Sequence, residues 1–247
     1  MLKSILQFII ISHFSIVVSF AQQTKGDFPF TSVKDVPELI QNELLKEGHI
    51  KIQIYLIRHA KPNLHKRFLS SSDQAQEYIE SYNKAPIHDI ELNKVKVDLK
   101  KAHQIYCSSL VRSQETALSL FGDSYVIVSD SIFREFELRI VRANSIVKLP
   151  LDLWKGVSRL FWLFGCNHKG IESHKAAKKR VVLAADNLEK LASQEETAIL
   201  VGHGMINAAI AKELKKRGWN VICKKGHLNL GATVLQKIIS EEKKNKF

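Results

Sequence analysis

Two apolar segments of this chain each end in a polar group that contains a histidine, and this pattern restricts the folds the chain can adopt. The β-branched run at 51–57 stops at Arg58 and His59, and the apolar run at 197–201 stops at the triplet 202–204, which contains His203. Short runs rich in β-branched residues are typical of buried strands. Both histidines are therefore expected at the carboxyl end of a central strand.

Helical patterns alternate with these strands along the rest of the chain. Further strands are expected at 105–107, 125–128 and 233–235, and helices at 36–47, 72–82, 110–121, 173–191 and 206–217. Ser108 and Ser109 are expected to cap the helix that follows them. Strands that alternate with helices predict an α/β fold with three layers, α/β/α, and a mostly parallel central sheet. In such sheets ligands collect at the carboxyl ends of the strands, so His59 and His203 are expected to share one pocket.

The first 21 residues have the pattern of a secretory signal peptide. Lys3 is followed by an apolar stretch, Ile5 to Phe20, in which 11 of 16 residues are apolar, and the small residues Ser19 and Ala21 suit a cleavage site. A buried first strand or an uncleaved membrane anchor is the alternative, but polar interruptions make the stretch weak for a span of about 20 apolar residues. The expected organisation is a leader at 1–21, an extension at 22–50 and one domain at 51–240.

The composition suits a globular protein with an affinity for anions. The chain has 247 residues and a formal charge of +12, so phosphorylated ligands and polyanions are both candidate partners. Basic residues on the helices near 175–180 and 212–217 could bind a polyanion, although such runs are usually solvated faces. Three cysteines without CxxC spacing do not indicate a disulfide scaffold or a metal knuckle, although one pair could bridge in an oxidising compartment.

Four short blocks, in order along the chain, resemble motifs of the histidine phosphatase superfamily, the phosphoglycerate mutase-like proteins. They are Leu-Ile-Arg-His-Ala-Lys-Pro at 56–62, Ser-Ser-Leu-Val-Arg-Ser-Gln-Glu-Thr-Ala at 108–117, Phe-Arg-Glu at 133–135 and Val-Gly-His-Gly at 201–204. A weaker similarity lies at 170–173, with Arg180 on the following helix. The resemblance extends over about residues 52–238.

This resemblance implies a role for each matched residue. His59 would be the nucleophile that accepts the phosphoryl group, Arg58 and Arg112 would hold the phosphate oxygens, and His203 would be the second pocket histidine. Glu135 would give a proton to the leaving group, with Glu137 as its competitor two residues on. Arginine suits phosphate because its planar fork binds two oxygens and keeps its charge. The scheme requires no cofactor and no metal.

Two departures from the family pattern limit what can be transferred. Ala60 replaces the usual glycine, and residues 138–170 are unlike the mutases. Within this variable insertion, Trp154 to Phe164 form an aromatic-rich segment that is expected to be a helix packed onto the core, with a lid or a membrane-touching surface as the alternative. Since this region would form the pocket wall, the known substrates of the family are not transferred.

The sequence thus predicts an exported phosphomonoester hydrolase that works through a phosphohistidine at His59. Its expected partner is a small phosphorylated substrate, not nucleic acid, in the periplasm or outside the cell, with no stable membrane span after leader removal. A phosphoglycerate mutase-type phosphotransferase and a non-catalytic polyanion-binding protein are the alternatives.

Overall fold

The computed structural model describes residues 48–66, 68–90, 104–122 and 124–241. The predicted leader, the predicted helix at 36–47 and most of the extension lie outside these residues. Within the described ranges, no helix has the length and apolar character needed to cross a membrane.

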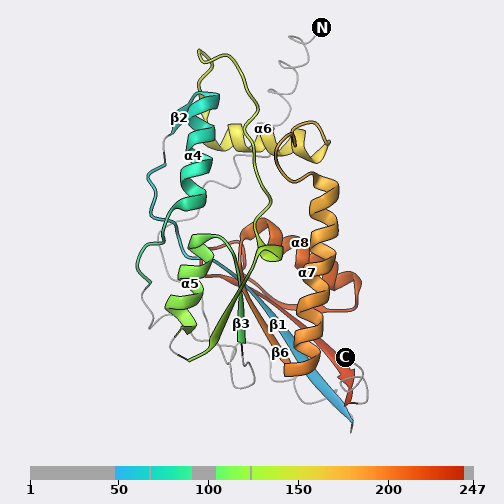
Figure 1. Ribbon diagram of the computed structural model, residues 1–247. Helices are drawn as coiled ribbons and strands as arrows, with labels where there is room; N and C mark the ends of the chain where they lie inside the picture. Colours follow the sequence, from blue (N-terminus) through green and yellow to red (C-terminus); the bar gives the residue numbers. More distant parts are fainter. Residues whose placement is uncertain (1–47, 67, 91–103, 123, 242–247) are drawn as a thin grey trace.

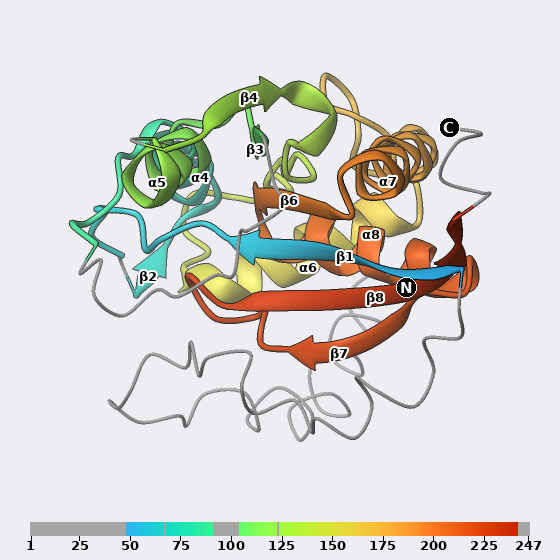
Figure 2. The ribbon, with the colours of Figure 1, turned by 90° about the horizontal axis from the view of Figure 1, so that it is seen from below.

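A six-stranded sheet forms the centre of the molecule, with the strand order β4-β3-β6-β1-β8-β7 (Figures 1 and 2). Strands β1, β6, β3 and β4 pair in parallel, whereas β8 is antiparallel to both β1 and β7. The mostly parallel sheet predicted from the sequence is therefore confirmed. The strands are β1 His49–Arg58, β3 Gln104–Ser108, β4 Val126–Asp130, β6 Thr197–Gly202, β7 Asn220–Lys224 and β8 Ala232–Ser240.

Both faces of this sheet are covered because successive side chains of a strand point to opposite sides. From β1, Ile52, Ile54 and Leu56 pack into a core cluster with helix α7 (His174–Glu195) and helix α8 (Gly204–Lys216). Tyr55 and Ile57 pack on the other side with helix α5 (Val111–Phe121). These are the three expected layers, α/β/α.

A second, smaller core lies beyond the carboxyl ends of the parallel strands (Figure 1). It joins helix α4 (Ser72–Lys84) to helix α6 (Leu151–Leu163), and a two-stranded sheet of β2 (Leu69–Ser70) and β5 (Leu149–Pro150) closes its edge. The aromatic segment of the insertion is helical, as expected, and its Trp154 packs with Ala75 and Ile79 of α4. The helix therefore packs on α4 within this second core, while Leu153 and Leu160 remain about half exposed.

One sequence prediction about local structure was wrong, and one strand of the central sheet was not predicted. Ser108 and Ser109 do not cap α5, whose N-cap is Leu110 without a side-chain bond. The Ser108 hydroxyl instead accepts from the Leu110 N–H and contacts His203, because the end of β3 lies beside the end of β6. Strand β7 was missed because it is an edge strand with only partly buried or exposed residues, and its apolar run, Val221 to Cys223, is only three residues long.

Candidate active site

His59 follows directly after β1 and is fixed by backbone contacts to neighbouring strands and loops. In the register of the sheet Arg58 is opposite Gly202, so the ends of β1 and β6 lie side by side. The His59 N–H donates to the Gly202 carbonyl at 2.9 Å, and the His59 carbonyl accepts from Asn229 Nδ2 at 2.9 Å. These contacts hold a side chain that is only 2% exposed.

The hydrogen bonds of the His59 ring define its tautomer. Nδ1 is 2.6 Å from the Ala60 carbonyl, and a carbonyl can only accept, so the proton lies on Nδ1. Nε2 then carries a lone pair, and it accepts a hydrogen bond from Arg112 Nε at 3.2 Å. Nε2 is thus unprotonated and faces the Arg112 guanidinium group.

The surroundings of His59 also keep the imidazole neutral. Burial lowers its pKa from 6.5 to about 3, and the positive charges of Arg112 and Arg58 add to this effect against the opposing bond to the Ala60 carbonyl. A buried imidazolium among arginines is unfavourable because it is both desolvated and repelled. The lowered pKa therefore favours the neutral form of the His59 imidazole near neutral pH.

His203 lies beside His59, with the two ring centroids 5.0 Å apart. Its Nε2 is 2.7 Å from the Ser108 hydroxyl, whereas its Nδ1 is buried and has no hydrogen-bond partner. Burial, followed by the charge of Arg112, lowers the pKa of His203 well below 6.5. A buried nitrogen without a partner is costly, so this site is prepared for a ligand that supplies one.

Two arginines provide the positive charge of the site. Arg112 on α5 is 2% exposed, stacks over the Tyr82 ring at 4.7 Å, and donates from Nη1 to the Tyr82 carbonyl at 3.3 Å. Arg58 donates to the His227 carbonyl, and its Nε is buried without a partner. A Cβ added to Gly204, the first residue of α8, would lie 3.6 Å from Arg58 Nε, which places this arginine at the N-terminus of that helix.

Glu135 and Glu137 differ clearly in their surroundings. The Glu135 carboxylate accepts from the N–H groups of Met205 and Ile206 in the first turn of α8, at 3.1 and 3.0 Å. Glu137 instead accepts from Arg134 and from the Glu172 N–H, on the side of the insertion. Glu135 is therefore the carboxylate that lies beside the helix following His203, whereas Glu137 connects loops.

Several residues that support this site were given no role from the sequence, although Thr116 and Gly202 lie within the matched blocks. Asn207 donates to the Ile57 carbonyl at 3.0 Å, and a Cβ on Gly202 would come within 2.4 Å of its Oδ1, so this contact requires glycine at 202. Thr116 accepts from the Ala60 N–H at 2.9 Å. These bonds join segments distant in the chain, so only the fold reveals them.

The structure thus brings Arg58, His59, Arg112 and His203 together at the carboxyl ends of β1, β3 and β6. Two cations, two imidazoles of lowered pKa and buried nitrogens without partners form a cluster whose chemistry suits a small tetrahedral anion. Fold and site together define an α/β protein with a cluster of arginines and histidines at the carboxyl ends of its parallel strands.

Comparison with known proteins identifies the family. The family model of the histidine phosphatase superfamily (branch 1) matches residues 91–241, and the chain belongs to this superfamily. The matched range includes Arg112, Glu135 and His203, whereas Arg58 and His59 precede it. No curated protein matches the chain.

Solved structures with a similar fold are distant in sequence. A mycobacterial glucosyl-3-phosphoglycerate phosphatase is 18% identical with a TM-score of 0.47, and covers 76% of this chain and 91% of its own. A phosphoglycerate mutase from Bacillus anthracis is 15% identical with a TM-score of 0.47, over 78% and 90% of the two chains. A phosphoserine phosphatase mutant from Entamoeba histolytica is 18% identical with a TM-score of 0.45, over 76% and 95%.

Proposed function

We propose that this chain hydrolyses phosphomonoesters through a covalent phosphohistidine at His59. The observation that carries the proposal is the hydrogen bonding of the His59 ring. Nδ1 donates to the Ala60 carbonyl, which leaves the lone pair of Nε2 directed toward Arg112. A neutral imidazole with a fixed tautomer is the form needed for nucleophilic attack. Membership of the superfamily supports phosphoryl transfer as the reaction class.

In the proposed first step Nε2 attacks phosphorus and the bond from phosphorus to the ester oxygen breaks. Arg58, Arg112 and the His203 ring hold the phosphoryl oxygens, whose negative charge is spread over the group in the transition state. Glu135 gives its proton to the departing alkoxide, which leaves as an alcohol. In the second step water attacks phosphorus, the phosphorus–nitrogen bond breaks, and Glu135 accepts a proton from the water.

A trapping experiment tests this proposal. The full chain would be incubated with p-nitrophenyl phosphate in EDTA, with His59→Ala as the test variant and His65→Ala, an exposed histidine, as its control. We expect turnover in the wild type and the control, none in His59→Ala, and a phosphoenzyme that is labile in acid and stable in base. Undiminished turnover in His59→Ala, or no turnover in any protein, would overturn the proposal.

The same preparation distinguishes the mutase alternative. A mutase would interconvert 2- and 3-phosphoglycerate faster than it releases inorganic phosphate from either of them. A phosphatase releases phosphate without producing the isomer. We expect phosphate release to dominate.

We also propose that the enzyme acts outside the cytoplasm. The support is the pattern at 1–21, with Lys3, the apolar stretch and the small residues before position 22. Expression of the full chain with cell fractionation and N-terminal mass analysis tests this. A mature protein that starts near residue 22 in the exported fraction is expected, and an intact, retained N-terminus would contradict export.

A further inference from the structure

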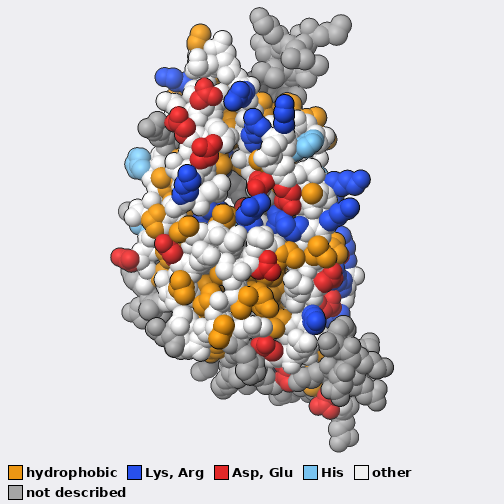
Figure 3. All heavy atoms as spheres, viewed as in Figure 1, with side chains coloured by type: hydrophobic (Ala, Val, Ile, Leu, Met, Phe, Trp, Pro, Cys, Tyr) orange, Lys and Arg blue, Asp and Glu red, His pale blue; other side chains and the backbone are white. Residues whose placement is uncertain are grey.

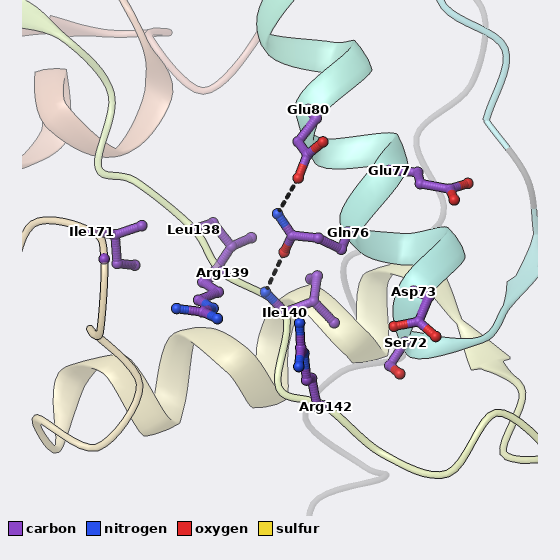
Figure 4. Close-up of a pocket in the computed structure, with 11 residues that line it drawn as sticks. Ser72, Asp73, Gln76, Glu77, Glu80, Leu138, Arg139, Ile140, Arg142 and Ile171 are labelled. Carbon is purple, nitrogen blue, oxygen red and sulfur yellow. Dashed lines mark hydrogen bonds between the residues drawn. The ribbon is translucent and has the colours of Figure 1, made fainter.

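A cavity of about 430 Å³ lies between α4, the chain at 138–142 and residues 170–171. It is outside the phosphate pocket, because none of the arginines and histidines described above lines it. Figure 3 shows acidic and basic side chains interspersed over the upper part of this face, above the sheet. The polar residues that matter here are Asp73, Gln76, Glu77 and Glu80 of α4, and Arg139 and Arg142 opposite them (Figure 4).

Both walls of this cavity belong to chain segments that continue to residues near Arg112 and His203. Along α4, Glu80 precedes Asn83 by three residues, about 4.5 Å of helix, and Asn83 contacts Arg112. On the other wall Leu138 follows Glu135 by three residues, at most about 10 Å of extended chain. The near end of the cavity is therefore about one helical turn from the residue that contacts Arg112, a separation that calls for a leaving group about as large as a sugar ring.

Gln76 holds the two walls at a fixed distance. Its Oε1 accepts from the Ile140 N–H at 2.9 Å, and its Nε2 donates to Glu80 at 2.9 Å (Figure 4). The Gln76 amide therefore links α4 to the extended chain at 138–142 in the absence of a ligand. Because this bond forms without a ligand, a ligand that fits between the two walls binds with a lower ordering cost.

The lining of the cavity contains both hydrogen-bond acceptors and donors. Its three carboxylates are nearly balanced in charge by its two arginines. Asp73, Glu77 and Arg142 are exposed to solvent, and none of them makes a hydrogen bond or ion pair with another described residue, so a ligand would replace water at these groups. Three carboxylates on α4 disfavour a second anionic group, and two arginines opposite them disfavour a cationic one. A hydroxyl group both donates and accepts, so a group with several hydroxyls satisfies both walls at once.

We propose that this cavity binds the leaving group of the substrate, and that this group is neutral, polyhydroxylated and of sugar size. The inference rests on the proposed phosphatase function and adds the substrate class to it. The substrate would place its phosphate between Arg112 and His59 and its hydroxyls between the acidic face of α4 and Arg142.

A substrate panel with cavity variants tests the inference. The panel contains glucose 6-phosphate, fructose 1,6-bisphosphate, phosphoserine, phosphoethanolamine and p-nitrophenyl phosphate. We expect the highest kcat/KM for the neutral sugar monophosphate. In Glu77→Gln and Arg142→Met this value should fall about tenfold, mainly through KM, because each loses a charged hydrogen-bonding partner of the sugar. Turnover of p-nitrophenyl phosphate, which does not fill the cavity, should change less than about twofold.

Lys212→Met is the matched control for Arg142→Met, because Lys212 is an exposed cation on α8. It should leave every substrate unchanged, and thermal unfolding should show that all variants are folded. If no member of the panel is hydrolysed, the proposed function fails. If p-nitrophenyl phosphate is hydrolysed but the sugar phosphate is not preferred, or the cavity variants do not alter its KM, only the subsite is refuted.

Discussion

The neutral state of buried His59 makes a quantitative prediction about stability in acid. Its pKa is about 3 in the folded protein, against 6.5 for an ordinary imidazole. As the pH falls below 6.5, the unfolded chain binds this proton first, so acid favours unfolding until the pH reaches about 3. Between pH 7 and pH 5 this one group should reduce the free energy of unfolding by about 2 kcal/mol.

The substitution His59→Asn isolates this contribution. Asparagine can still donate toward the Ala60 carbonyl but cannot titrate, so the variant should lose about 2 kcal/mol less than the wild type between pH 7 and pH 5. Urea denaturation of the full chain at several pH values measures the difference. His65→Asn controls for the loss of an imidazole, because His65 is exposed. If the two proteins show the same pH dependence within about 0.5 kcal/mol, burial among arginines does not keep His59 neutral.

Three further substitutions test other contacts of the site. Arg112→Lys keeps the charge but removes the planar fork that reaches His59 and Tyr82, so kcat/KM should fall about 100-fold; a change below threefold would contradict its role. Glu135→Gln should lower kcat about 100-fold for an alkyl phosphate but less than tenfold for p-nitrophenyl phosphate, whose leaving group needs little protonation; equal losses would argue against proton donation. Ser108→Ala removes the 2.7 Å contact to His203 and should cost about 1–3 kcal/mol of stability in urea denaturation, and an unchanged midpoint would show that this contact is unimportant.

The sequence predicted the central part of the fold because its signals there are local. The strand at 51–57, the face of the helix that contains Val181 and Leu188, and the strand at 197–201 all have apolar patterns that burial requires, and the structure buries them. The position of each histidine after a strand was readable for the same reason. Parallel pairing of β1 and β6 then places both at one edge.

Contacts between distant segments could not be predicted in this way. The Ser108 hydroxyl bonds to His203 although 95 residues separate them, and this pairing exists only because β3 and β6 are neighbours. The aromatic-rich helix was expected to pack onto the core, and the structure shows that its Leu151 and Trp154 pack on α4 in a separate cluster, a partner that its sequence did not specify. An amphipathic pattern indicates that a face is buried and does not specify its partner.

The sequence by itself determined which residue types are available for phosphate chemistry and that His59 and His203 stand at strand ends. The tertiary structure decided the tautomer of His59, the depression of its pKa, the different surroundings of Glu135 and Glu137, and the cavity between α4 and residues 138–142. The physical reason is that strand patterns depend on neighbouring residues in the chain. Hydrogen-bond direction, desolvation and cavity shape depend on groups that only the folded chain brings together.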